Sequence, residues 1–344
     1  MSSEAVVSSR GRLVFVGAVH EAVPALTALL RSAVDVAEVV TMPTGHAGRA
    51  SGYVDLEPIA AASGVKVTRC TDINSADSVA RIRRLEPDLL VVVGWTRLLS
   101  AELLSVPRRG CVGFHASLLP RHRGRAPVNW AILRGDTQAG NTMMYLDAGT
   151  DTGDVIDQVP VPIGPDDTCA TAYAKVGAAG ADMLSRHLAA LLAGTAPRRP
   201  QPPASEPPLG KRTPEMGITD WNRPARDVHN WIRALTSPYP GAFSFRSGRK
   251  IMLWESAVPV RQASSGSPGQ VLGCDEFGLR VATADGSLLV TSVSDEGASP
   301  EPALSWVSRN DLNGGARFDA VDPATASWAI GLGPQPAGAT ARRS

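Results

Sequence analysis

The sequence predicts an α/β protein with a doubly wound, mostly parallel sheet and a smaller carboxyl-terminal domain of β structure. Over residues 10–195, short apolar or β-branched runs alternate with segments of helical apolar spacing, which is typical of a parallel sheet covered by helices. Residues 196–216 are rich in proline, as extended linkers are. Short apolar runs separated by Gly, Ser and Asp follow over residues 217–315, and this spacing favours a small open β-barrel.

The first domain is expected over residues 10–195, and its elements follow the apolar pattern in order. Strands are expected at Arg12–Gly17, Val34–Thr41, Val65–Cys70, Asp88–Leu99, the run ending at His115, and Thr142–Leu146. Helices are expected at Pro24–Arg31, Leu56–Ser63, Ser75–Leu85, Pro127–Leu133 and Cys169–Leu192. The turn after the first strand holds only Gly17 of a G-x-G-x-x-G pattern, so a nicotinamide or flavin cofactor is disfavoured.

The remainder divides into a linker over residues 196–216, a β-barrel-like domain over 217–315 and a tail. A helix is expected over Ala225–Leu235. Short strands are expected at Ala242–Phe245, Lys250–Trp254, Gly269–Cys274, Gly278–Ala282 and Ser287–Val293. Residues 316–344 are low in apolar content, and a flexible tail is expected there.

Residues Gly110–Pro127, GCVGFHASLLPRHRGRAP, are the most informative stretch. An apolar run ends at His115, and a small-residue turn and a basic loop broken by Pro and Gly follow. This is the pattern of a buried parallel strand that delivers a side chain to the carboxyl edge of the sheet, where ligands bind in open α/β proteins. A lone histidine at a strand end is often held by a backbone carbonyl instead.

Two sequence blocks resemble a known family. His-x-Ser-Leu-Leu-Pro from His115, followed by Arg-x-Arg-Gly and Ala-Pro, is similar to the signature of the folate-dependent formyltransferases, and LDAGTDTGD at Leu146–Asp154 matches a second block downstream. Ser237–Phe243 is similar to the junction with that family's carboxyl-terminal domain. The resemblance covers about residues 12–315. It implies a Rossmann-like formyltransferase that moves a formyl group from 10-formyltetrahydrofolate to a primary amine without a metal.

The resemblance also implies a folate site at the end of the central strand. Val92 would line a pteridine pocket, and Arg97, Leu98 and Leu99 would contribute backbone groups. Plain core packing is the alternative for Val92 and Leu98. In the second block, Asp147 and Thr150 are expected to contact the folate.

Formyl transfer needs a group that takes the proton of the amine, and His115 suits that role because imidazole exchanges protons near neutral pH. Asp151 follows 36 residues later, where the family places a catalytic carboxylate, and would orient and tune the imidazole. Asp147 and Asp154 compete for this role on sequence alone. The family's Asp-Thr-Gly pattern favours Asp151.

One position departs from the family pattern. The family carries an asparagine two residues before the histidine, where its amide helps to hold the oxyanion, and this chain has Gly113. We expect Asn141, on the neighbouring strand, to act as a substitute catalytic donor, with Asn129 as a weaker candidate. Alternatively Asn141 caps its own strand and a backbone N–H or water serves, or the chain is a weakly active or repurposed binding protein.

The acceptor amine is expected to be a small molecule, most of all a nucleotide-linked amino sugar. RGRAPVNW at Arg123–Trp130 is similar to the enzymes that formylate such sugars. Ser117, Arg123 and Arg125 are therefore expected to bind the substrate. The net charge is +1 without a prominent basic patch, which disfavours tRNA as a partner. Methionyl-tRNA is kept as the alternative acceptor.

Composition indicates a globular protein, with 43% apolar and 19% charged residues. No apolar run reaches membrane-spanning length and the amino terminus lacks a signal-peptide core, so a cytoplasmic protein without a membrane partner is expected. The four cysteines are scattered, which favours free thiols. The oligomeric state is left open.

Overall fold

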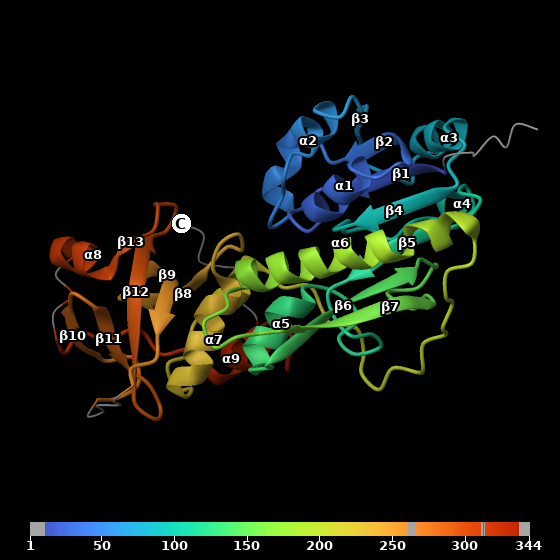
Figure 1. Ribbon diagram of the computed structural model, residues 1–344. Coiled ribbons are helices and arrows are strands. Elements are labelled where there is room, and N and C mark those ends of the chain that lie inside the picture. The colour runs from blue at the N-terminus through green and yellow to red at the C-terminus, as the bar shows by residue number, and fades with distance from the viewer. Residues whose placement is uncertain (1–10, 261–265, 311, 313, 337–344) are drawn as a thin grey trace, which may run out of the picture. The chain divides into compact units, whose positions relative to one another are not determined.

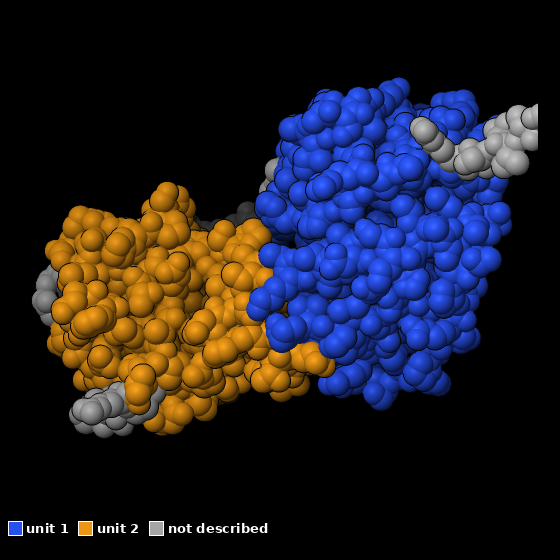
Figure 2. All heavy atoms as spheres, in the orientation of Figure 1, with its two compact units in different colours: residues 1–124, 139–162, 173–209 blue, residues 125–138, 163–172, 210–344 orange. Residues whose placement is uncertain are grey.

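The computed structural model describes residues 11–260, 266–310, 312 and 314–336. These residues form two compact units, coloured separately in Figure 2. Unit 1 contains the described residues up to Gly124, with Ala139–Pro162 and Tyr173–Leu209. Unit 2 contains Arg125–Gln138, Ile163–Ala172 and the described residues from Gly210 onward. The segments Arg125–Gln138 and Ile163–Ala172, which the sequence placed in the first domain, therefore group with the second unit.

A seven-stranded sheet forms the centre of unit 1 and confirms the predicted mostly parallel architecture (Figure 1). Its strand order is β3-β2-β1-β4-β5-β6-β7. The strands are β1 (Arg12–Gly17), β2 (Asp35–Thr41), β3 (Val67–Arg69), β4 (Leu89–Val93), β5 (Cys111–His115), β6 (Gln138–Tyr145) and β7 (Val155–Pro162). β1 to β5 pair in parallel, and β5 pairs with β6 antiparallel. The order reverses between β1 and β4, and ligands bind at such a switch point in doubly wound folds.

Helices cover both faces of this sheet, because successive strand residues point to opposite sides. The helices of unit 1 are α1 (Ala22–Leu30), η1 (Thr44–Arg49), α2 (Glu57–Ala61), α3 (Ala76–Arg84) and α4 (Ala101–Leu104), together with α6 (Cys169–Ala193) from Tyr173 onward. On one face, Phe15 and Val112 pack in one core with residues of α1 and α6, such as Leu184. On the other face, Val92 packs with residues of α3 and α4, such as Ile82.

Two strand predictions differ from the structure. The central strand β4 ends at Val93 instead of Leu99, because Gly94 turns the chain with a φ of 64°. A Cβ on Gly94 would lie 2.0 Å from Cγ2 of Val19, so only glycine allows this close approach. The strand β7, VIDQVPVP, was missed; it contains two prolines, which are uncommon within strands.

Unit 2 contains a six-stranded antiparallel sheet, which confirms the predicted carboxyl-terminal β domain. Its order is β10-β11-β12-β9-β8, with β13 paired to β12. The strands are β8 (Ala242–Arg246), β9 (Arg249–Ala257), β10 (Val271–Asp275), β11 (Gly278–Ala282), β12 (Ser287–Asp295) and β13 (Glu301–Pro302). Its helices are α5 (Pro127–Arg134), η2 (Pro214–Gly217), α7 (Ala225–Leu235), α8 (Ala303–Asn310) and α9 (Pro323–Ala329).

The expectation of a flexible tail is wrong for residues 316–336; residues 337–344 lie outside the described chain. Phe318 is 2% exposed and stacks on Trp221 with ring centroids 5.3 Å apart. Trp328, in α9, is buried as well. Two aromatic anchors are enough to dock a segment whose overall composition is polar, because each large ring buries a large apolar area.

Arg212 attaches α9 to the rest of unit 2. Its guanidinium carbon lies 4.7 Å from the ring centroid of Trp130 and 5.1 Å from that of Trp231. Its Nη1 donates to the Ala329 carbonyl at 3.0 Å, and its Nη2 donates to the Met216 carbonyl at 2.8 Å. Burial lowers the pKa of this guanidinium to about 10.

Replacing Arg212 by alanine is expected to lower the free energy of unfolding by about 2 kcal/mol, because charged hydrogen bonds and cation–π contacts are lost. Urea unfolding measures the change. Arg226, exposed on α7, is the control, and its alanine variant should unfold like the wild type. Equal stability of both variants would show that Arg212 does not hold α9.

Candidate active site

His115 is the last residue of β5 and lies at the carboxyl edge of the parallel strands. Its side chain is 7% exposed. Nε2 lies 2.7 Å from the carbonyl oxygen of His122, and Nδ1 lies 3.5 Å from Oδ2 of Asp151. A carbonyl oxygen only accepts, so Nε2 carries a proton in this contact and Nδ1 faces the carboxylate.

Asp151 lies in the loop between β6 and β7. Its backbone has a φ of 54°, a left-handed conformation that few residues other than glycine adopt, although Asp is among the more tolerant. Its Oδ2 accepts the backbone N–H of Gly124 at 2.8 Å. The carboxylate is therefore held between the imidazole of His115 and a main-chain donor.

The two competing carboxylates of the same block have other partners. Asp147 accepts from the Thr152 hydroxyl at 2.7 Å and from the Gly149 amide at 3.0 Å, so it shapes the loop itself. Asp154 lies 3.9 Å from Arg198. Thr150 is exposed on this loop, next to Asp151. The structure brings Asp151 to His115, and it places Asp147 and Thr150 in the same loop.

The expectation for Asn141 is contradicted by the strand register. His115 pairs with Thr142 across β5 and β6, and directly opposed residues of an antiparallel pair point to the same face. Asn141 therefore points to the other face, where its Nδ2 donates to the Val176 carbonyl of α6 at 2.8 Å. The Asn129 amide donates to the Ala234 carbonyl at 2.6 Å. Neither amide is available as the oxyanion donor that the sequence analysis assigned to it.

The space beside Gly113 is filled by Leu146. A Cβ built on Gly113 would lie 2.6 Å from Cδ2 of Leu146. Gly113 and His115 are two residues apart on one strand and share a face. The Leu146 side chain, which follows β6, thus fills the space where the family pattern places an asparagine side chain.

The residues expected to bind substrate have local partners. The Ser117 hydroxyl donates to the Arg121 carbonyl at 2.7 Å and closes a turn. Nη2 of Arg123 lies 3.4 Å from Oε1 of Gln201. Arg125 is exposed and belongs to unit 2, whereas His115 belongs to unit 1.

The segment expected to hold the folate lies on the same face of the sheet as His115. Val92 and Leu99 are 8% and 7% exposed and pack in the core that includes Leu146. Leu98 is 54% exposed. Arg97 lies 3.7 Å from Asp72 and is exposed.

Asn74 holds this segment by donating to the Leu98 carbonyl at 2.9 Å and accepting the Ser100 amide at 2.8 Å. Within the described chain, the amides of residues 97–99 form no hydrogen bond with another main-chain group. The indole N–H of Trp95 is buried and has no partner in the same described part. Unused donors beside an apolar core suit a flat ligand with a polar edge.

Three residues of unit 1 with notable surroundings were missed by the sequence analysis. Trp95 follows the central strand, and an aromatic residue after the most apolar run was a usable signal. Glu21 is the N-cap residue of α1, and burial raises the pKa of its carboxyl to about 7. Gln201 lies in the proline-rich segment, where composition gave no sign of its contacts.

Comparison with known proteins agrees with this geometry. The profile of the formyl transferase family matches residues 12–188, and that of the formyl transferase carboxyl-terminal domain matches residues 211–311. The chain belongs to the formyltransferase family. The methionyl-tRNA formyltransferase of Geobacter sulfurreducens is 35% identical over 311 residues, which cover 89% of this chain and 96% of that protein. The methionyl-tRNA formyltransferase of Pelotomaculum thermopropionicum is 37% identical over 293 residues, 83% of this chain and 92% of that protein.

Solved structures share the fold of this formyltransferase. HypX from Aquifex aeolicus in complex with tetrahydrofolic acid has a TM-score of 0.63 at 19% identity, covering 92% of this chain and 50% of that one. The N-formyltransferase from Helicobacter canadensis, in complex with folinic acid and dTDP-3-aminofucose, has a TM-score of 0.64 at 18% identity, covering 81% and 98%. At these identities the likeness concerns the fold alone.

The expectation of a nucleotide-linked amino sugar or other small molecule as acceptor, with tRNA less favoured, is wrong. Relatives that are 34–37% identical over most of this formyltransferase are named methionyl-tRNA formyltransferases. The net charge of +1 does not exclude an RNA substrate, because RNA binding depends on the local distribution of charge. The short stretch Arg123–Trp130 carried less information than similarity along the whole chain.

In the described residues, no helix of this formyltransferase is both long and apolar enough to cross a membrane. No group of three or more His, Cys, Asp or Glu side chains is placed to hold a metal ion in that part of the chain. Cys70, Cys111, Cys169 and Cys274 are free thiols.

Proposed function

We propose that this formyltransferase moves the formyl group of 10-formyltetrahydrofolate to the amine of methionyl-tRNA. The acceptor is inferred from similarity along nearly the whole length of methionyl-tRNA formyltransferases. The match covers 96% of the Geobacter sulfurreducens protein. The His115–Asp151 pair at the carboxyl edge of the sheet supports the reaction type.

The folate substrate supplies the formyl group, and the chain's residues handle the proton and the charge. A new bond forms between the amine nitrogen and the formyl carbon, and the bond from that carbon to the folate nitrogen breaks. The amine loses one proton, and the departing folate nitrogen gains one. His115 takes the amine proton at Nδ1, because Nε2 donates its proton to the His122 carbonyl, and it returns a proton to the departing folate nitrogen. Protonation of Nδ1 puts the positive charge 3.5 Å from Oδ2 of Asp151, which stabilises it.

The tetrahedral oxyanion needs a hydrogen-bond donor. Gly113 supplies no side chain, and the amides of Asn129 and Asn141 are bound to the carbonyls of Ala234 and Val176. The donor therefore comes from a main-chain N–H, from water or from the substrates. Loss of one such donor typically lowers a rate about 10²- to 10³-fold, so without this replacement the enzyme would be slow.

The residues at the end of β4 fit a folate. Its pteridine ring is flat and has donors and acceptors along its edge, which suits the unused amides of residues 97–99 and the unpartnered indole N–H of Trp95. Val92, Leu99 and Leu146 would line the apolar side. Asp147 and Thr150 would contact the substrate from the loop that carries Asp151.

The test is formyl transfer from 10-formyltetrahydrofolate to methionyl-tRNA, with uncharged tRNA and free methionine as controls. Formylmethionyl-tRNA is the expected product, detected as N-formylmethionine after the tRNA ester is hydrolysed. Neither control should be formylated. Folate binding is followed in parallel by tryptophan fluorescence, with Trp95→Phe as the variant that should reduce the signal. Folate binding without transfer to methionyl-tRNA would favour the weakly active or repurposed binding protein, and absence of folate binding would overturn the proposal.

A further inference from the structure

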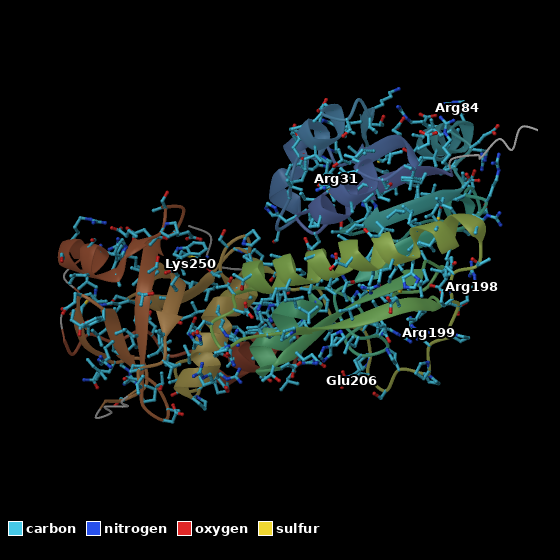
Figure 3. All side chains as sticks on the ribbon, in the orientation of Figure 1. Arg31, Arg84, Arg198, Arg199, Glu206 and Lys250 are labelled. Carbon is cyan, nitrogen blue, oxygen red and sulfur yellow. The ribbon has the colours of Figure 1, made fainter. Side chains whose placement is uncertain are left out.

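We propose that the proline-rich segment Ala196–Leu209 positions the catalytic pair, and that Gln201 is the positioning residue; this inference builds on the roles proposed above for His115 and Asp151. The segment contains no helix, as composition predicted. It is nevertheless attached to the rest of unit 1 by hydrogen bonds at three points. Figure 3 labels Arg198, Arg199 and Glu206 along it.

Gln201 holds the main chain of the Asp151 loop. Its Nε2 donates to the carbonyl oxygen of Asp151 at 3.0 Å and to that of Gly153 at 2.8 Å. Its Oε1 lies 3.4 Å from Nη2 of Arg123. Both donors of one side-chain amide are thus used on the residues that carry and follow the catalytic carboxylate, and its acceptor faces the basic loop.

Leu209 holds the main chain of Arg123 and Gly124, which contacts Asp151 from the basic loop. Its amide donates to the Arg123 carbonyl at 2.6 Å, and Leu209 forms a parallel bridge with Gly124. A Cβ on Gly124 would lie 2.5 Å from the Leu209 carbonyl oxygen, so the two backbones touch. Gly124 is the residue whose N–H donates to Oδ2 of Asp151. The segment therefore fixes both the backbone of Asp151 and the donor that orients its carboxylate.

Arg199 anchors the start of the segment to β7. The Arg199 amide donates to the Val155 carbonyl at 3.0 Å, and the Val155 amide donates to the Arg199 carbonyl at 2.8 Å. Its Nη2 donates to the Ile156 carbonyl at 3.2 Å. Gln201 is flanked by Pro200 and Pro202, which restrict the backbone and reduce the entropy lost when the segment docks.

The physical reason for this arrangement is the conformation of Asp151. A positive φ is unfavourable for a residue with a Cβ, so the surroundings must hold it. Without the bonds from Gln201 the loop can relax, and the carboxylate moves relative to Nδ1 of His115. A displacement of about 1 Å at a catalytic group can cost about 10²-fold in rate.

The test compares Gln201→Leu with Glu206→Gln, an exposed position on the same segment. Gln201→Leu is expected to lower kcat about 10- to 100-fold with little change in folate affinity or melting temperature, and Glu206→Gln to leave all three unchanged. In an Asp151→Asn background, Gln201→Leu should cost little more, because both changes act on one contact. The proposal is overturned if Gln201→Leu leaves kcat unchanged. It is also overturned if Gln201→Leu lowers kcat by the same factor in the Asp151→Asn background as in the wild type.

A second measurement does not depend on the reaction. In ¹⁵N-histidine-labelled protein, the ring chemical shifts of His115 in Gln201→Leu should approach those in Asp151→Asn, while Glu206→Gln matches the wild type. Shifts in Gln201→Leu that equal the wild type would show that Gln201 does not position Asp151. If these shifts move as expected but no variant and no wild type formylates methionyl-tRNA, the proposed function fails and the positioning role stands.

Discussion

Replacing His115 by alanine is expected to reduce formyl transfer to methionyl-tRNA about 10²- to 10⁴-fold, the usual contribution of a positioned general base. The variant loses the group that takes the amine proton, whereas the segment around Val92 and Leu99 that would bind folate is untouched. Single-turnover formylation measures the chemical step, and tryptophan fluorescence measures folate binding. Asp151→Asn should cause a severe loss as well, because the amide lacks the charge that stabilises the protonated ring.

A matched control exists in the same unit. His187 lies 3.0 Å from Asp157 through Nε2, on α6 and β7. It has the same pair of residue types, but it does not lie at the carboxyl edge of β5. His187→Ala and Asp157→Asn should formylate like the wild type. Near-normal turnover by His115→Ala or Asp151→Asn would remove that residue from the mechanism.

Replacing Gly153 by alanine is expected to destabilise unit 1 by about 3 kcal/mol, at the upper end of the usual cost of overpacking, and to abolish most activity. A Cβ at this position would lie 1.7 Å from the carbonyl oxygen of Tyr145, so the loop must move. Gly153 also accepts from Gln201 at 2.8 Å, and the same movement would displace Asp151. Thermal unfolding and single-turnover formylation measure the two effects.

Gly210→Ala is the control for this variant. A Cβ on Gly210 would meet nothing within 4 Å, and the substitution should leave both melting temperature and rate unchanged. If Gly153→Ala melts and reacts like Gly210→Ala, the loop is able to absorb the methyl group without moving Asp151, contrary to the close approach to Tyr145.

The proximity of His115 and Asp151 was accessible from sequence, and the surroundings of these two residues were not. His115 at a strand end and Asp151 in the following block were both predicted, and they lie side by side. Asn141 was assigned to the same site because it lies on the strand expected beside that of His115. The register pairs His115 with Thr142 instead, and a shift of one residue sends a side chain to the opposite face of a sheet.

The contacts of the polar carboxyl-terminal segment and of the proline-rich segment were not predicted, for a related reason. Composition reports the average tendency of a segment to dock, whereas docking here depends on a few contacts. Phe318 and Trp328 hold residues 316–336 against unit 2, and Arg212 binds the carbonyl of Ala329. Gln201 reaches carbonyls 48 and 50 residues away along the chain, which no local pattern records.

The sequence by itself determined the alternation of strands and helices, the carboxyl-terminal β domain and the placement of His115 at the end of a buried strand, because these depend on apolar periodicity and local turn chemistry. Only the tertiary structure decided that Leu146 fills the space beside Gly113, that Asn141 faces α6, and that the proline-rich segment holds the Asp151 loop. Those outcomes depend on strand register and on hydrogen bonds between residues distant in the chain, and neither leaves a periodic trace in the sequence.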